Sequence, residues 1–139
     1  HLYRCRSILT GVEAVRQGWP GRRVVLVFQP HRYTRTRDLL DEFAQVLADA
    51  DALVVAEVYA AGEAPIPGAD SKSLCRAIRT RGRVEPVLLK TLEELPDALA
   101  GIVRAGDVVL TMGAGHIGAV ASELPRTLPA AVAMRGQRS

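Results

Sequence analysis

The segment FQPHRYTRTRDL, residues 28–39, concentrates side chains that bind anions. Arg32 and Arg35 are three positions apart, so one turn of helix would place both guanidinium groups on the same side, close to His31. A guanidinium group grips a carboxylate or a phosphate through paired hydrogen bonds. We therefore predict that His31, Arg32 and Arg35 form an anion site. The alternative is a solvated basic turn ahead of an acidic helix.

A second candidate is the glycine loop in VVLTMGAGHIG, residues 108–118, where Gly113, Gly115 and Gly118 spell G-x-G-x-x-G. That spelling matches the dinucleotide-binding fingerprint, which belongs to the first strand-turn-helix unit of a sheet and needs an acidic residue about 20 positions later. Here the loop comes near the end of the chain, and the position 20 residues beyond Gly118 is Arg138. We therefore predict that the chain binds neither NAD nor FAD.

Two interpretations of this loop remain. Its glycines allow a tight turn with close packing, or the backbone of Gly113, Ala114 and Gly115 offers N–H groups to a ligand at the mouth of the sheet. We expect His116 to be a solvent-facing residue of the same loop. The sequence alone leaves both interpretations open.

The elements that position these loops alternate along the chain. Continuous apolar runs predict buried strands at 22–28, 52–58, 85–89 and 107–112. Helical spacing predicts helices at 36–50 with Thr36 as a cap, at 71–82 with Asp70 or Ser71 as a cap, and at 117–124. A fourth helical pattern at 91–103 contains Pro96, so we expect either a break there or a helix that starts near Pro96.

Strand-helix alternation of this kind predicts an α/β fold, a Rossmann-like, doubly wound and mostly parallel sheet with helices on both faces. Ligands of such sheets bind beyond the carboxyl ends of the strands. The loops at 29–36, 59–70, 90–91 and 113–116 are therefore where chemistry is expected. Both candidate sites lie in them.

The composition of the chain excludes several classes of binding partner. The formal charge is +3, only 4% of the residues are aromatic, and Lys72 and Lys90 are the only lysines. Nucleic-acid binding is not favoured, because the arginines are not interleaved with aromatic residues. We predict that Arg37 is solvated and pairs with Asp41. No apolar run could span a membrane and no signal peptide opens the chain. The two cysteines form no metal-ligand spacing, so we expect a cytoplasmic domain without a metal site.

Three strings carry a family resemblance: VFQPHRYTRTRDLLDEFAQVLADAD, EVYAAGEAPIPGADSKSLCRAI and VVLTMGAGHIG. In order and spacing they resemble the C-terminal domain of the UDP-N-acetylmuramate–L-alanine ligase family, the Mur ligases of bacterial peptidoglycan synthesis. The resemblance implies a three-domain enzyme whose N-terminal UDP-binding domain and central ATPase domain are absent here. No G-x-x-x-x-G-K-[ST] phosphate loop occurs in the chain.

The resemblance also implies a reaction. ATP phosphorylates the carboxylate of UDP-N-acetylmuramate, and the amine of L-alanine attacks the resulting acyl phosphate. His31, Arg32 and Arg35 would line the amino-acid and acyl-phosphate pocket, and the loop of Gly113, Ala114 and Gly115 would offer backbone to it. ATP and Mg²⁺ would be bound mainly by the absent domains, so this chain alone is expected to be inactive. The alternatives are a non-catalytic anion- or nucleotide-binding module and a related ligase for another amino acid.

We expect three segments. Residues 13–124 form the ligase-type domain and residues 125–139 a frayed tail. Residues 1–12 are expected to be atypical, because the Asp-Tyr-x-His-His-Pro pattern that the family carries at this junction does not occur. Such a segment is either an altered junction or sequence foreign to the domain.

Overall fold

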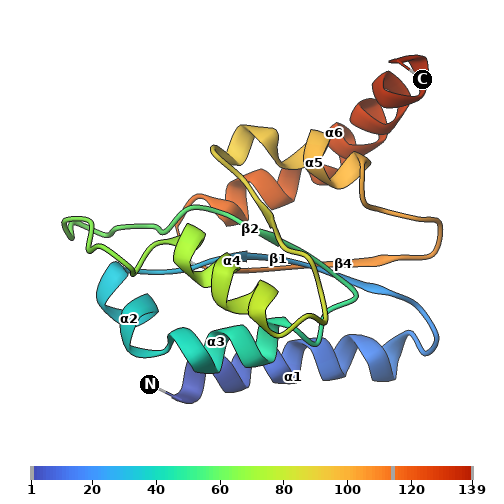
Figure 1. The fold of residues 1–139 in the computed structure, drawn as a ribbon. Helices are drawn as coiled ribbons and strands as arrows, with labels where there is room; N and C mark the ends of the chain where they lie inside the picture. Colours follow the sequence, from blue (N-terminus) through green and yellow to red (C-terminus); the bar gives the residue numbers. More distant parts are fainter. Residues whose placement is uncertain (1, 114, 139) are drawn as a thin grey trace.

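The computed structural model describes residues 2–113 and 115–138, without the side chains of residues 2–4 and 138. Its centre is a four-stranded sheet in the order β3-β2-β1-β4 (Figure 1). The strands are β1 Val24–Gln29, β2 Ala52–Val55, β3 Val87–Leu88 and β4 Val108–Gly113. All three pairings are parallel, which confirms the predicted α/β class.

Strand β1 is buried along its whole length because helices cover both faces of the sheet. Leu26 and Phe28 face one core, and Val25 and Val27 face the other. The first core is built with side chains of α1 Leu2–Gly18, α3 Leu40–Leu47 and α4 Ser71–Thr80. The second is built with side chains of α5 Leu95–Ala100 and α6 Ile117–Arg138.

The predicted helix at 36–50 is two helices, α2 Tyr33–Asp38 and α3. Leu39 separates them with φ −116° and ψ 21°. Thr36 does not cap a helix, since it is buried inside α2 and its hydroxyl donates to the Arg32 carbonyl. The predicted start at residue 36 is too late, because the residues before Thr36 are mostly basic or polar and form no apolar stripe.

Helix α1 has no counterpart among the predicted elements. It runs across the boundary that we expected between residues 12 and 13, and buries Cys5, Ile8, Val12 and Val15. Their spacing of three and four positions is that of a helix face. The segment before residue 13 therefore contributes to the core of this structure.

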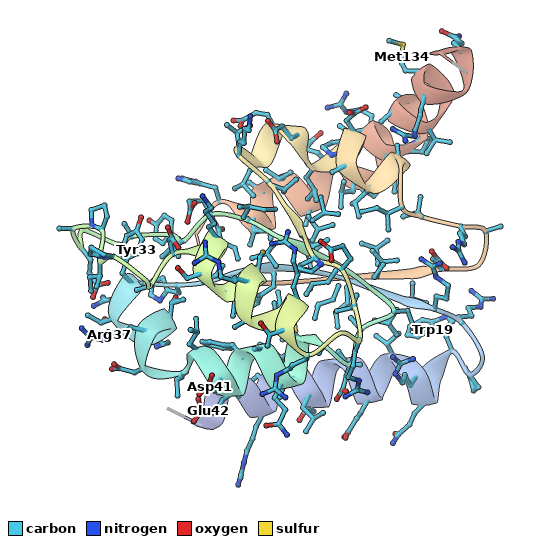
Figure 2. All side chains as sticks on the ribbon, viewed as in Figure 1. Trp19, Tyr33, Arg37, Asp41, Glu42 and Met134 are labelled. Carbon is cyan, nitrogen blue, oxygen red and sulfur yellow. The ribbon has the colours of Figure 1, made fainter. Side chains whose placement is uncertain are left out.

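Helix α6 replaces the frayed tail that we expected at 125–139. It continues to Arg138 although Pro125 and Pro129 lie inside it. Leu124 is buried and Leu128 packs against the same core, so apolar contacts continue the helix past Pro125. The last turns carry the exposed Met134 and extend away from the sheet (Figures 1 and 2).

Within the predicted helix at 91–103, the alternative of a helix that starts near Pro96 is confirmed. A short 3-10 turn, Leu92–Glu94, precedes α5, and Pro96 lies in the first turn of that helix, where its missing N–H costs nothing. None of the helices in the described part of the chain is long and apolar enough to cross a membrane.

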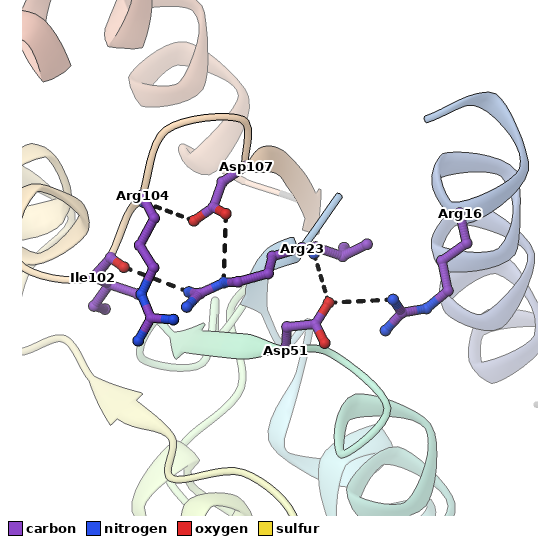
Figure 3. Close-up of polar contacts among 7 residues, drawn as sticks. Arg16, Arg23, Asp51, Ile102, Arg104 and Asp107 are labelled. Carbon is purple, nitrogen blue, oxygen red and sulfur yellow. Dashed lines mark hydrogen bonds and ion pairs between the residues drawn. The ribbon is translucent and has the colours of Figure 1, made fainter. Parts of the chain in front are cut away.

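The amino ends of three strands are tied together by charged side chains (Figure 3). Asp51, just before β2, accepts from the Val24 backbone N–H at 2.7 Å and pairs with Arg16 at 3.2 Å. Arg23, just before β1, pairs with the buried Asp107 at 3.4 Å, just before β4. This edge is therefore occupied by structural contacts. In Figure 2, Trp19 lies at this end of the molecule and Tyr33 lies at the opposite end.

Helix α4 begins at a side-chain cap, as predicted for Asp70. Its carboxylate accepts from the Ser73 backbone N–H at 2.9 Å and from the Ser73 hydroxyl at 2.7 Å. The Ser73 side-chain hydrogen bond is the main reason that the pKa of Asp70 is lowered.

Asp70→Ala is expected to lower the free energy of unfolding at pH 7 by about 1 kcal/mol, the usual effect of losing an N-cap. Because the pKa of Asp70 is lowered in the folded chain, the cap is fully present above the ordinary aspartate pKa. It is lost as the pH falls through the folded value. Urea unfolding at pH 7 and at a series of pH values below the ordinary aspartate pKa would measure this, with Asp70→Asn as the control that keeps an N-cap acceptor at every pH. An equal deficit for Asp70→Ala and Asp70→Asn at pH 7 would contradict the capping role.

Candidate functional site at the carboxyl edge of the sheet

The two candidate loops lie side by side because β1 and β4 are neighbours. Their pairing runs to Gln29 and Gly113, the last residues of the two strands. Beyond β1, His31 forms an isolated parallel bridge with Tyr59, which follows β2. The loops after β1, β2 and β4 therefore meet at one edge, which is the edge where a parallel sheet binds ligands.

His31 and Arg35 are in direct contact. The Arg35 Nη1 lies 3.0 Å from the His31 Nδ1, and both side chains are half-buried. A guanidinium group can only donate, so Nδ1 must accept, and the neutral imidazole that this requires carries its proton on Nε2. The pair thus presents a guanidinium group and an imidazole N–H donor next to each other.

Arg32 belongs to the same loop but is placed differently. Its backbone has φ +71°, a left-handed conformation that is uncommon for a residue with a side chain. Its N–H donates to the Tyr59 carbonyl at 2.8 Å, and its carbonyl accepts from the Thr36 N–H and hydroxyl. These contacts fix the backbone of Arg32 while its side chain is exposed.

Helix α2 receives its cap from a distant residue. Glu63 Oε1 accepts from the backbone N–H groups of Tyr33 and Thr34 at 2.6 and 3.1 Å, and Oε2 accepts from the Thr34 hydroxyl at 2.6 Å. The Thr34 side-chain hydrogen bond is the largest cause of the lowered pKa of Glu63, and Arg32 adds a smaller electrostatic contribution. Glu63 was not among the predicted site residues, although it lies in the loop at 59–70, where ligand chemistry was expected.

Tyr59 joins the arginine loop to the glycine loop. Its ring stacks on His31 with centroids 5.8 Å apart and meets His116 edge-on at 5.7 Å. Tyr59 was not among the predicted site residues either. A tyrosine at the end of a strand carries no local signal that it will touch residues far away in the chain.

Two glycines of the loop are required by close packing. Gly113 has φ +148°, and a Cβ built there would lie 2.7 Å from the Gln29 carbonyl oxygen. Gly115 has φ +94°, and its Cβ would lie 2.5 Å from the Tyr59 ring. At Gly118, a Cβ meets no atom of the described residues within 4 Å. Ala114, which we predicted as part of the site, lies outside the described residues.

Gly118 therefore departs from the dinucleotide fingerprint, whose third glycine permits close packing of helix on strand.

Arg37 does not form the ion pair with Asp41 that was predicted. It pairs instead with its neighbour Asp38, at 3.0 Å. Arg37 is exposed, as expected for a solvated residue. Among the described residues, no group of three or more His, Cys, Asp or Glu side chains is arranged to hold a metal ion.

A comparison with known protein families identifies the family of the chain. Residues 5–115 match the family model described as Mur ligase, glutamate ligase domain. The chain belongs to the Mur ligase family. The matched region starts inside helix α1 and ends in the glycine loop, so it includes both candidate loops.

Two curated relatives are similar to this Mur ligase domain over most of its length. UDP-N-acetylmuramate–L-alanine ligase of Methylococcus capsulatus is 55% identical over 117 residues, which cover 84% of this chain and 25% of the relative. The ligase of the same name from Burkholderia thailandensis is 61% identical over 113 residues, which cover 81% of this chain and 24% of the relative. The chain thus spans about a quarter of the length of these relatives.

A solved structure has the same fold. It is a domain assigned to a UDP-N-acetylmuramate:L-alanyl-γ-D-glutamyl-meso-diaminopimelate ligase of Haemophilus ducreyi, with a TM-score of 0.62. The likeness covers 91% of this chain and 83% of that one, at 19% sequence identity. At that identity it supports the α/β fold of the Mur ligase domain and nothing about its substrate.

Proposed function

We propose that this chain is the amino-acid-binding C-terminal domain of an ATP-dependent ligase that joins L-alanine to UDP-N-acetylmuramate in bacterial peptidoglycan synthesis. The observation that carries the proposal is the His31–Arg35 pair at the carboxyl edge of the sheet, in a chain more than half identical to ligases named for this reaction.

In this proposal the chain holds the nucleophile. The guanidinium group of Arg35 binds the carboxylate of L-alanine, and the Nε2–H of His31 donates a second hydrogen bond to the substrate. The exposed Arg32 contributes positive charge at the mouth of the site, and the backbone of the loop formed by Gly113, Ala114 and Gly115 borders it. Fixing the carboxylate, which does not react, leaves the amine free to attack.

Holding an amine in an attacking geometry is a large part of catalysis in a reaction of two molecules. The amine attacks the carbonyl carbon of the muramoyl acyl phosphate, and the tetrahedral intermediate collapses with loss of phosphate. ATP and Mg²⁺ are bound mainly by other domains of the complete, cytoplasmic enzyme. We assign no metal-binding role to residues of this chain.

A chimaera tests the proposal. This chain replaces the matched segment of the Burkholderia thailandensis relative, and ADP release is measured with ATP, UDP-N-acetylmuramate and L-alanine. We expect release that depends on L-alanine from the chimaera and none from the chain alone. The parent relative, assayed alongside, is the positive control.

Two results would overturn the proposal. An inactive chimaera beside an active parent would favour a non-catalytic module, as would tight binding of ATP or a UDP-sugar by the isolated chain. Activity with another amino acid in preference to L-alanine would favour a related ligase.

A further inference from the structure

Helix α2 presents Arg35 to the candidate site, yet its own sequence does not cap it. Arg32 occupies the N-cap position and makes no side-chain capping hydrogen bond. A helix needs acceptors for its first N–H groups. Because α2 has only six residues, Tyr33–Asp38, few hydrogen bonds within the helix can stabilise it.

The missing acceptors come from the loop after β2. Ala61 and Gly62 both have positive φ, and the Glu63 N–H donates back to the Ala60 carbonyl at 3.0 Å. This tight turn brings the Glu63 carboxylate to the first turn of α2. Both carboxylate oxygens are used, one by two backbone N–H groups and the other by the Thr34 hydroxyl.

We propose that Glu63 is a positioning residue of the amino-acid site, whose carboxylate fixes the start of α2 and thereby the placement of Arg35. The inference rests on the proposed function, since it concerns the same site. Glu63 does not touch the substrate in this scheme. It acts through the backbone from which the binding side chains project.

The geometry also restricts how an anion can bind. A helix N-terminus usually attracts an anionic ligand, but here the Glu63 carboxylate already occupies that position. The Tyr33 and Thr34 N–H groups at the start of α2 are therefore not available to a substrate carboxylate. Glu63 also lies close enough to Arg32 for the two charges to interact.

Kinetics of the active chimaera test the proposal. Glu63→Ala is expected to raise the KM for L-alanine about tenfold or more, because misplacing binding groups by even 1 Å is costly, and to leave the KM for ATP unchanged. Glu63→Gln keeps an amide oxygen for the two backbone N–H groups and should restore most of the loss. Glu85→Ala is the matched control, since it removes an exposed carboxylate paired with Arg79.

Nuclear magnetic resonance of the isolated chain tests the cap without any assay of activity. The lowered pKa of Glu63 means that its hydrogen bonds persist below the ordinary glutamate pKa and are lost only as the pH falls through the folded value. The amide protons of Tyr33 and Thr34 should therefore shift together in that low-pH range. In Glu63→Gln this titration should disappear.

The outcomes separate the two proposals. If Arg35→Ala raises the KM for L-alanine and Glu63→Ala does not, the positioning role is wrong and the proposed function stands. If neither variant changes it, the amino-acid site itself is wrong, and the role of Glu63 falls with it. Equal increases in the KM for ATP and for L-alanine in Glu63→Ala would indicate general damage to the domain and would also overturn the positioning role.

Discussion

Arg35→Ala is expected to raise the KM for L-alanine about 30- to 150-fold in the chimaera, with the KM for ATP unchanged. A hydrogen bond to a charged group contributes about 2–3 kcal/mol, and each 1.4 kcal/mol is a factor of ten. The variant removes the guanidinium group proposed to hold the carboxylate. It also removes the contact that fixes the tautomer of His31. Initial rates at varied L-alanine and saturating ATP would measure the effect.

Helix α2 offers a matched control two positions away. Arg37 is also an arginine of α2, but it is exposed and pairs with Asp38. Arg37→Ala therefore changes the net charge equally and is expected to leave the KM for L-alanine within about twofold, as for most surface substitutions. Similar increases for both variants would point to a general electrostatic effect rather than a binding role for Arg35.

Gly113→Ala is expected to destabilise the chain by about 2–6 kcal/mol. Backbone strain at positive φ accounts for about 1–3 kcal/mol of this, and overpacking adds a similar amount. The added Cβ would meet a backbone oxygen of the neighbouring strand, which cannot rotate away. Urea unfolding followed by far-UV circular dichroism would give the loss, provided that the slope m is unchanged.

Gly118→Ala is the counterpart of this experiment. The position has open space and lies in the first turn of α6, so alanine is expected to leave stability unchanged or to raise it by up to about 1 kcal/mol. A dinucleotide fingerprint would require the third glycine as well as the first. A large loss of stability in Gly118→Ala would contradict our account of the loop.

Much of the fold could be predicted because buried parallel strands have a strong apolar signal. All four strands lie where the apolar runs predicted them, although β3 is only Val87–Leu88. The order of the strands was not predictable from alternation alone. It is this order, with β4 beside β1, that brings the arginine loop and the glycine loop together.

The contacts of the candidate site could be predicted only where they join residues that are close in sequence. His31 and Arg35 are close in sequence, so their contact follows from local spacing. The cap by Glu63 and the ring contacts of Tyr59 join segments about 30 residues apart or more. Capping rules describe neighbours within one helix end, and they give no signal for an acceptor that arrives from another loop.

The position of β4 has a consequence for the order of events in a growing chain. Val24, at the start of β1, pairs with Val108, which is synthesised long after it. Until β4 emerges from the ribosome, one edge of β1 has no partner strand, and unpaired apolar edges promote aggregation. Contacts so distant in sequence also form slowly. The glycine loop comes at the end of β4, so the two candidate loops can meet only after this last strand has been synthesised and paired with β1.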